Sequence, residues 1–325
     1  NNSIYRHNLL FWNSLLRLKQ HKIQITSKVP LSRVLIPTTV GFSIFTWLGF
    51  DEKTNTPEDE LILSIKHSVL FIQRNECDKA ERLLHVALRQ AQQMQHQNGI
   101  TYIYDVMANL ALQREQLDKA KSLFIAVTQR LMANGATEDD LRVIQLSIKL
   151  ARISHLKKEL EVARLGFDWC LKKLEAALNY ESTPESIQLM AIAEDWYGRL
   201  LLDCNEQERG LNMMKKALEH MRGLEAVEMD HIVVQLNDLG TICEEINRLD
   251  ESVDYFKEAI KCGKSIEMED LGTMYVNLGK VYIKKNMLTE ARKSCGYGWK
   301  LGQDNKKEDI KKEASACIKQ VNSLS

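Results

Sequence analysis

Pairs of small residues separated by twelve positions recur along most of this chain, and they restrict its fold more than any other feature. The six pairs are Ser68/Ala80, Ala108/Ala120, Ala151/Ala163, Gly198/Gly210, Gly240/Ser252 and Gly279/Ala291. A short polar turn lies between the members of each pair. Two antiparallel helices joined by a tight turn approach closely only where neither carries a bulky side chain. Each pair therefore predicts one helical hairpin.

Larger apolar residues follow each pair at a fixed distance. Four residues after the second member come Leu84, Phe124, Phe167, Met214, Phe256 and Cys295, and three residues further come Ala87, Val127, Cys170, Ala217, Ala259 and Gly298. A single hairpin leaves its apolar face bare, so neighbouring hairpins must stack to cover it. We predict an all-α solenoid of about six hairpins over residues 61–302.

The last residues, 303–325, have no partner hairpin. Their apolar residues form one stripe at helical spacing, which comprises Ile310, Ala314, Cys317, Ile318 and Val321. This periodicity predicts a C-terminal capping helix over the last hairpin.

The small pairs and the apolar positions after them resemble the tetratricopeptide repeat. Successive second members are separated by 40, 43, 47, 42 and 39 residues, whereas the usual repeat is about 34 residues long. The resemblance therefore implies repeats with lengthened helices or loops, as in arrays of the kinesin light chain type.

The N-terminal region has a different composition. Residues 1–50 contain six Lys or Arg and no Asp or Glu, which is typical of a mitochondrial presequence over 1–33; a disordered basic tail is the alternative. Residues 34–50 are 17 uncharged residues, a length that just spans a hydrocarbon core of about 30 Å. We predict a transmembrane segment there, with a peripheral or cleaved hydrophobic segment as the alternative, and an acidic linker over 51–60.

Charge and cysteine content exclude several classes of protein. Subtracting the six N-terminal bases from the 44 in the chain leaves 38 bases against 44 acids. A weakly acidic body argues against nucleic acid as a partner. The seven cysteines are scattered without a CxxC pair, so we expect buried, reduced thiols and neither a disulfide framework nor a zinc site.

No catalytic motif is present. The sequence contains no phosphate-binding loop, no GxGxxG after a strand, no HExxH and no GxSxG. We therefore predict that the protein is not an enzyme and has no metal and no cofactor. His67 is expected to be a hydrogen-bonded core residue, and Trp169 and Trp196 are expected to be packing residues.

In such an array, the concave groove formed by the first helix of each hairpin is the expected binding surface. The groove candidates are Tyr102, Asp105, Asn109, Arg152, His155, Asp195, Arg199, Asn237, Glu244 and Lys280. Polar side chains there can bond an extended peptide, and Arg152, Arg199 or Lys280 can take a carboxylate. The alternative is that these are merely exposed helix residues.

Two stretches carry a more specific resemblance. Residues 99–124 (GITYIYDVMANLALQREQLDKAKSLF) and 144–153 (IQLSIKLARI) resemble a mitochondrial branch of the tetratricopeptide repeat family that serves respiratory complex III, the cytochrome bc1 complex. The resemblance implies an inner-membrane assembly and maintenance factor that binds complex III subunits, including the Rieske iron–sulphur protein. Its implied role is to allow turnover of the Rieske subunit and removal of its fragments.

The charges around residues 34–50 predict an orientation. Bases precede the segment and Asp51 and Glu52 follow it, so the positive-inside bias favours repeats that face the intermembrane space. The alternative is passage through to the matrix, which the marginal length of the segment and Pro37 allow.

For the function, the competing interpretation is a soluble adaptor of the kinesin light chain kind that carries protein cargo. Such an adaptor has no use for an acid-free basic segment followed by an apolar run of membrane length.

Overall fold

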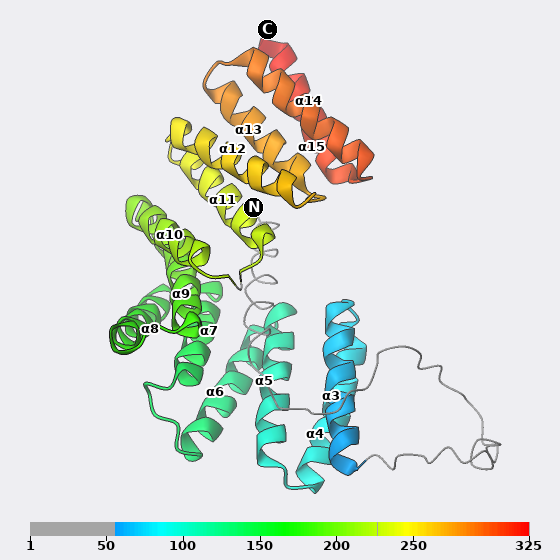
Figure 1. Ribbon diagram of the computed structural model, residues 1–325, viewed down its shortest axis with the longest axis vertical. Helices are drawn as coiled ribbons and strands as arrows, with labels where there is room; N and C mark the ends of the chain where they lie inside the picture. Colours follow the sequence, from blue (N-terminus) through cyan, green and yellow to red (C-terminus); the bar gives the residue numbers. More distant parts are fainter. Residues whose placement is uncertain (1–55, 226, 325) are drawn as a thin grey trace, which may run out of the picture. The chain divides into compact units, whose positions relative to one another are not determined.

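The computed structural model describes residues 56–225 and 227–324, where every regular element is an α-helix (Figure 1). The helices are α3 (Pro57–Gln73), α4 (Cys77–Gln93), α5 (Gln97–Gln113), α6 (Leu117–Ala133), α7 (Leu141–Leu156), α8 (Leu160–Tyr180), α9 (Pro184–Asp203), α10 (Gln207–Arg222), α11 (Met229–Glu245), α12 (Leu249–Ser265), α13 (Leu271–Lys284), α14 (Leu288–Asp304) and α15 (Glu308–Leu324). The prediction of an all-α chain of consecutive hairpins is confirmed.

The described helices belong to two compact units. One unit ends at Arg130 within α6, and the other begins at Leu131. In the first unit, α3 packs on α4 and α4 on α5, while Arg130 of α6 bonds Thr101 of α5 (Nε–Oγ1 2.9 Å). In the second unit, each helix from α7 to α15 contacts the next. Each hairpin thus packs on its neighbour within its own unit.

The small pairs lie at the helix crossings, as predicted, and all twelve residues are buried. At the crossing of α9 and α10 two glycines face each other. A Cβ atom on Gly198 would lie 2.8 Å from the carbonyl oxygen of Gly210, and one on Gly210 would lie 2.7 Å from that of Gly198. The bulky residue that follows each pair is also buried; Phe124, Phe167 and Phe256 are each 0% exposed. The predicted repeat phase is therefore confirmed.

The turns between helices are closed by residues in the left-handed backbone region. The non-glycine residues with positive φ are Asn75, Gln95, Glu115, Lys158, Asn205, Asn247, Glu267, Asn286 and Lys306. After α9, the amide of Asn205 donates to the carbonyl of Leu202 (3.0 Å), and that of Glu206 donates to Leu201 (2.8 Å). These bonds satisfy carbonyls that the helix end would otherwise leave free.

The capping helix is α15, which packs on α14 and α13. Its stripe of Ile310, Ala314, Cys317 and Val321 is buried and Ile318 is half-buried, as the periodicity predicts. The expectation that all cysteines are reduced is wrong for one pair, because Cys317 forms a disulfide with Cys295 of α14. A separation of 22 residues gives no short-range motif, and the helix that folds back brings the sulfurs together.

Two predictions for the N-terminal part, the acidic linker over 51–60 and a core position for His67, differ from the structure. Helix α3 begins at Pro57, and Glu58, Asp59 and Glu60 of the predicted linker lie in its first turn. The prediction for His67 is wrong, because this side chain is exposed. The buried stripe of α3 consists of Leu61, Ser68 and Ile72. Successive residues of a helix point about 100° apart, so His67 points away from the core although its neighbour Ser68 is buried.

The predicted presequence and transmembrane segment, residues 1–33 and 34–50, lie outside the described residues. Within the part of the chain that the structure describes, no helix combines the length and apolar character needed to cross a bilayer.

Candidate functional site

The predicted groove positions lie on the first helices of the hairpins, and most of them are buried. Asp105, Asn109, Arg152, His155, Asp195, Arg199 and Asn237 are buried, whereas Tyr102, Glu244 and Lys280 are partly exposed. The structure therefore places most of these side chains among polar contacts inside the array. Their role in binding a partner stays a prediction.

Arg199 is at the centre of a buried polar cluster between α9 and α11. Its guanidinium donates to Asp195 one turn earlier (Nε–Oδ2 2.9 Å, Nη2–Oδ1 3.0 Å) and to Asp238 of α11 (Nη2–Oδ2 2.7 Å). Gln235 of α11 donates to Asp195 as well (Nε2–Oδ1 3.0 Å). Burial lowers the pKa of Arg199, but the two aspartates raise it further, to above its usual range.

These four residues join two repeats through charge and geometry. The planar guanidinium makes two bonds to one carboxylate and a third to another, which fixes the relative position of α9 and α11. The buried guanidinium of Arg199 is stable only beside the carboxylates of Asp195 and Asp238, since desolvating an unpaired charge is strongly unfavourable. The cluster therefore acts first as an interhelical clamp.

Arg152 and His155 of α7 form a second cluster. Arg152 Nη1 lies 2.8 Å from His155 Nδ1, and His155 Nε2 lies 3.0 Å from Asp203 Oδ2 at the end of α9. Lys158 also donates to Asp203 (2.8 Å). Because the guanidinium can only donate, Nδ1 accepts and Nε2 carries the hydrogen in the neutral imidazole.

Burial and the neighbouring guanidinium keep the His155 imidazole neutral. Burial and the adjacent Arg152 lower the pKa of His155 from 6.5 to about 4, against the opposing effect of Asp203. Burial raises the pKa of Asp203, but bonds from Lys158 and His155 bring it below its usual value. Arg152 also lies over the buried Trp196 ring, 5.8 Å from its centroid, and that burial confirms Trp196 as a packing residue.

The remaining candidates in the unit that begins at Leu131 each pair with a residue two helices further along the chain. Asn237 accepts from Asn277 of α13 (Oδ1–Nδ2 3.0 Å), Glu244 pairs with Lys284 of α13 (3.0 Å), and Lys280 pairs with Glu313 of α15 (3.1 Å). On α5, Asn109 donates to the carbonyl of Asp105 (2.7 Å). Among the groove candidates, Asp195 thus contacts Arg199, Arg152 contacts His155, and Asn109 contacts Asp105.

Sequence reasoning missed the partners Gln235, Asp238, Asn277 and Asp203. A signal for the first three was present: they lie 39 or 40 residues after Asp195, Arg199 and Asn237. That separation is close to one repeat, and a stacked array brings equivalent positions of neighbouring repeats together.

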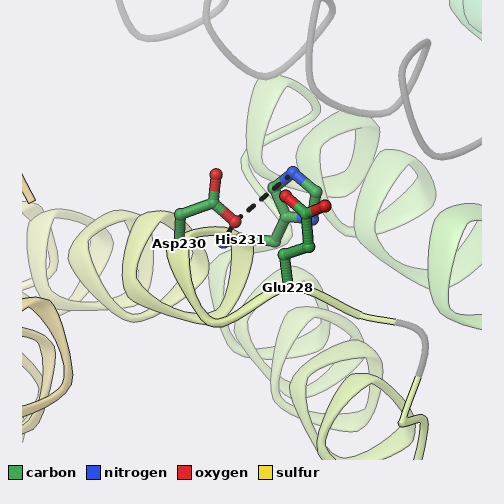
Figure 2. Close-up of side chains that lie close together, drawn as sticks. All are labelled: Glu228, Asp230 and His231. Atoms are coloured by element: carbon green, nitrogen blue, oxygen red, sulfur yellow. Dashed lines mark hydrogen bonds and ion pairs between the residues drawn. The ribbon is translucent and has the colours of Figure 1, made fainter. Parts of the chain in front are cut away.

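One group of side chains has metal-ligand chemistry in the described part of the chain. Figure 2 shows Glu228 and Asp230 beside His231 at the start of α11, with candidate ligand atoms within 4.8 Å of one another. Burial lowers the pKa of His231, against the effect of Asp230. The partial positive charge at a helix N-terminus disfavours a cation there, so we assign no metal to this group.

The sequence profile of the tetratricopeptide repeat matches residues 236–261, which cover the second half of α11 and most of α12. The chain is also 34% identical over 287 residues to a "Tetratricopeptide repeat protein 19 homolog, mitochondrial" of Drosophila melanogaster, covering 87% of this chain and 77% of that relative. The chain belongs to the tetratricopeptide repeat protein 19 family. The resemblance drawn from residues 99–124 and 144–153 is therefore confirmed.

A second member of the tetratricopeptide repeat protein 19 family is similar over a somewhat shorter part of the chain. The human protein, "Tetratricopeptide repeat protein 19, mitochondrial", is 30% identical over 253 residues, which are 74% of this chain and 67% of the human protein. The family relationship therefore includes both units of the described chain and is not limited to one repeat.

Solved structures share the fold of this tetratricopeptide repeat protein 19 family member. The sensor-bearing signal transduction ATPase PH0952 of Pyrococcus horikoshii matches with a TM-score of 0.59 at 16% identity, covering 82% of this chain and 38% of that one. Kinesin light chain-like repeats of "Podosopora anserina" match with a TM-score of 0.52 at 11% identity, covering 63% and 95%. At these identities the likeness concerns the repeat fold alone.

Proposed function

We propose that this protein is a non-enzymatic protein-binding scaffold that maintains respiratory complex III. In this role it binds complex III subunits, including the Rieske iron–sulphur protein, and allows turnover of the Rieske subunit and clearance of its fragments. The observation that carries the proposal is the family membership, with 34% identity over 87% of the chain. The likeness to kinesin light chain repeats is one of fold alone and gives no support to a cargo adaptor.

Direct contact with the partner is assigned to the accessible groove positions. Lys280, whose side chain is 41% exposed, and the partly exposed Glu244 and Tyr102 are reachable by an extended segment. The buried candidates Arg152, His155, Asp195, Arg199 and Asn237 hold the first helices in place. A charged pair at the surface, such as Lys280 with Glu313, can exchange its weak internal bond for one to a partner.

The test is affinity purification of the tagged full chain from detergent-solubilised mitochondria. Complex III subunits are expected among the co-purified proteins, and cells without the protein are expected to accumulate Rieske fragments. Lys280→Glu should reduce recovery of these subunits, whereas Lys319→Glu, an exposed position on α15, should not. Absence of complex III subunits from the wild-type purification would refute the proposal.

We further propose mitochondrial import through residues 1–33 and anchoring in the inner membrane through residues 34–50, with the repeats in the intermembrane space. The relatives' names, the basic residues before the apolar segment and the acids after it support this placement,. The disulfide between Cys295 and Cys317 also supports it, since disulfides persist in oxidising compartments,.

Protease treatment of mitoplasts tests the orientation. Repeats in the intermembrane space are digested once the outer membrane is opened. Repeats that stay intact until the inner membrane is dissolved lie in the matrix, which would contradict the proposed orientation while leaving a role in complex III open to its own test.

A further inference from the structure

Three helices meet at the last crossing of the array. Cys295 of α14 is 0% exposed and Cys317 of α15 is 3% exposed, and their Cα atoms are 5.9 Å apart, a normal separation for a disulfide. Gly279 of α13 faces both sulfurs, so that a Cβ atom there would collide with Cys295 Sγ and lie 3.2 Å from Cys317 Sγ. The absence of a side chain at Gly279 leaves room for this sulfur pair.

Cys295 occupies a position that the other repeats fill with a larger side chain. Its equivalents are Leu84, Phe124, Phe167, Met214 and Phe256, all 0% exposed. A thiol at this position fills less volume than Leu, Met or Phe, and the interior of an array tolerates few voids. Here the missing volume is supplied by Cys317, which enters from the capping helix.

We propose that the Cys295–Cys317 disulfide is a redox-controlled latch that holds the capping helix α15 on the last hairpin. The buried apolar side chains of α15 are Ile310, Ala314, Cys317 and Val321, with Ile318 half-buried. Apart from Ala316 and Leu324, its outer residues are polar. The covalent bond adds a fixed link between this terminal helix and α14 to the apolar packing. Its reduction releases α15 and uncovers the apolar surface of α13 and α14.

The chemistry of the latch is thiol–disulfide exchange with an oxidoreductase that bears a reactive disulfide. One cysteine thiolate of the chain attacks that disulfide and displaces one of its sulfurs as a thiolate. The second cysteine thiolate then attacks the mixed disulfide, so the oxidoreductase leaves as a dithiol and two electrons have passed to it from the chain. A dithiol reductant reverses both steps.

Burial determines when this exchange takes place. Both sulfurs are inaccessible while α15 is docked, and exchange requires access of a second thiol or disulfide. The bond therefore forms before α15 has docked fully, and it breaks only when α15 opens locally. The latch consequently responds slowly to a change in redox conditions, whereas an exposed disulfide would respond at once.

The first experiment identifies the bond in the full chain from mitochondria. Thiols are trapped by acid quenching, the protein is denatured and alkylated with N-ethylmaleimide without reduction, and tryptic peptides are analysed. Cleavage after Lys293, Lys300, Lys312 and Lys319 yields SCGYGWK (294–300) and EASACIK (313–319). We expect these two peptides to be joined before reduction and separate after it. If each carries its own maleimide before reduction, the proposal is wrong.

The second experiment measures how strongly the backbone amides of α15 are protected from hydrogen exchange in the purified chain, with and without a dithiol reductant. Reduction is expected to speed exchange in α15 by roughly 300-fold, the factor that closing a loop of 22 residues implies,, and to leave α9 unchanged. Wild-type protein serves here, so no variant has to fold. Equal protection of α15 in both states would show that the bond is no latch.

A pair of variants completes the test. Cys295→Ser should exchange in α15 as fast as the reduced wild type and should no longer respond to reductant. Cys262→Ser, which removes a free, half-buried thiol on α12, should behave as wild type. A reductant response that persists in Cys295→Ser would assign the effect to other cysteines and overturn the proposal. Complex III binding is not measured, so these outcomes are independent of the proposed function.

Discussion

Arg199 of α9 donates a hydrogen bond across the boundary between two repeats to Asp238 of α11, with 2.7 Å between Nη2 and Oδ2. The side chains are 5% and 3% exposed. Asp195, which shares the guanidinium, is 0% exposed. One cation therefore neutralises two buried carboxylates that belong to different hairpins.

Replacement of that cation should be strongly destabilising. Arg199→Met keeps most of the aliphatic volume but removes the guanidinium that bonds both Asp195 and Asp238, so we expect a loss of about 3–5 kcal/mol in the free energy of unfolding. Urea denaturation of the full chain measures it. Arg209→Met is the control, because Arg209 is 63% exposed in its pair with Glu206; it should cost less than about 1 kcal/mol. Similar losses in both variants would contradict the clamp.

Gly198→Ala should destabilise the α9–α10 crossing. The added Cβ atom would lie 2.8 Å from a backbone oxygen and 2.7 Å from Met214 Cγ, and overpacking of this kind costs about 1–3 kcal/mol. Gly296 of α14 provides a matched control, because a Cβ atom there meets nothing within 4 Å. Gly296→Ala should instead stabilise its helix by up to about 1 kcal/mol. Thermal unfolding of the two variants should shift in opposite directions, and equal shifts would mean that the crossing is not close.

His155 should make the protein less stable in mild acid. Its pKa in the folded protein is lowered to about 4, so the unfolded chain takes up the proton first. The associated stability is fully present above pH 6.5 and is lost as the pH falls toward 4, by about 2–3 kcal/mol. Unfolding free energies measured across this range should fall less steeply in His155→Gln. A slope in His155→Gln equal to that of the wild type would contradict the assignment.

The protein should contain no structural metal. Glu228, Asp230 and His231 approach one another, but they do so at a helix N-terminus, where the peptide dipoles oppose a cation. Elemental analysis of the purified chain should therefore find no stoichiometric zinc or iron, and dialysis against EDTA should leave the thermal midpoint unchanged. One zinc ion per chain, lost in Asp230→Asn, would refute this expectation.

The repeat phase was predictable because it depends on local constraints. A hairpin must have small residues at its crossing, such as Gly198 and Gly210, wherever it stands in the chain, and a bulky residue one turn later must fill the next gap. The same reasoning located Phe167 and Phe256 in the core. Each small pair and the bulky residue after it lie within about twenty residues of sequence, so the repeat phase can be predicted without knowing contacts between distant residues.

The state of the groove residues was less predictable because their partners are one repeat away. From the sequence alone, Arg199 is expected to be a free cation in the groove. Its partner Asp238 lies 39 residues later, and only the stacked repeats bring the two side chains together. Cys295 is likewise expected to be a free thiol, because only the folding back of α15 brings Cys317 to it. His67 is only one position from the buried Ser68, and on a helix that step turns a side chain from the core to solvent.

The left-handed residues of the turns imply that a hairpin of this protein is not self-sufficient. Glu115, Lys158 and Lys306 hold a backbone conformation that costs an ordinary L side chain about 1–2 kcal/mol. Such a conformation persists only where the surrounding structure enforces it. The backbone bonds of each turn and the packing of its two helices on their neighbours hold this conformation together, so a hairpin cut out of the chain would lose part of what keeps its bend. In this architecture the hairpins become ordered as they stack, so the smallest fragment that folds should contain more than one hairpin.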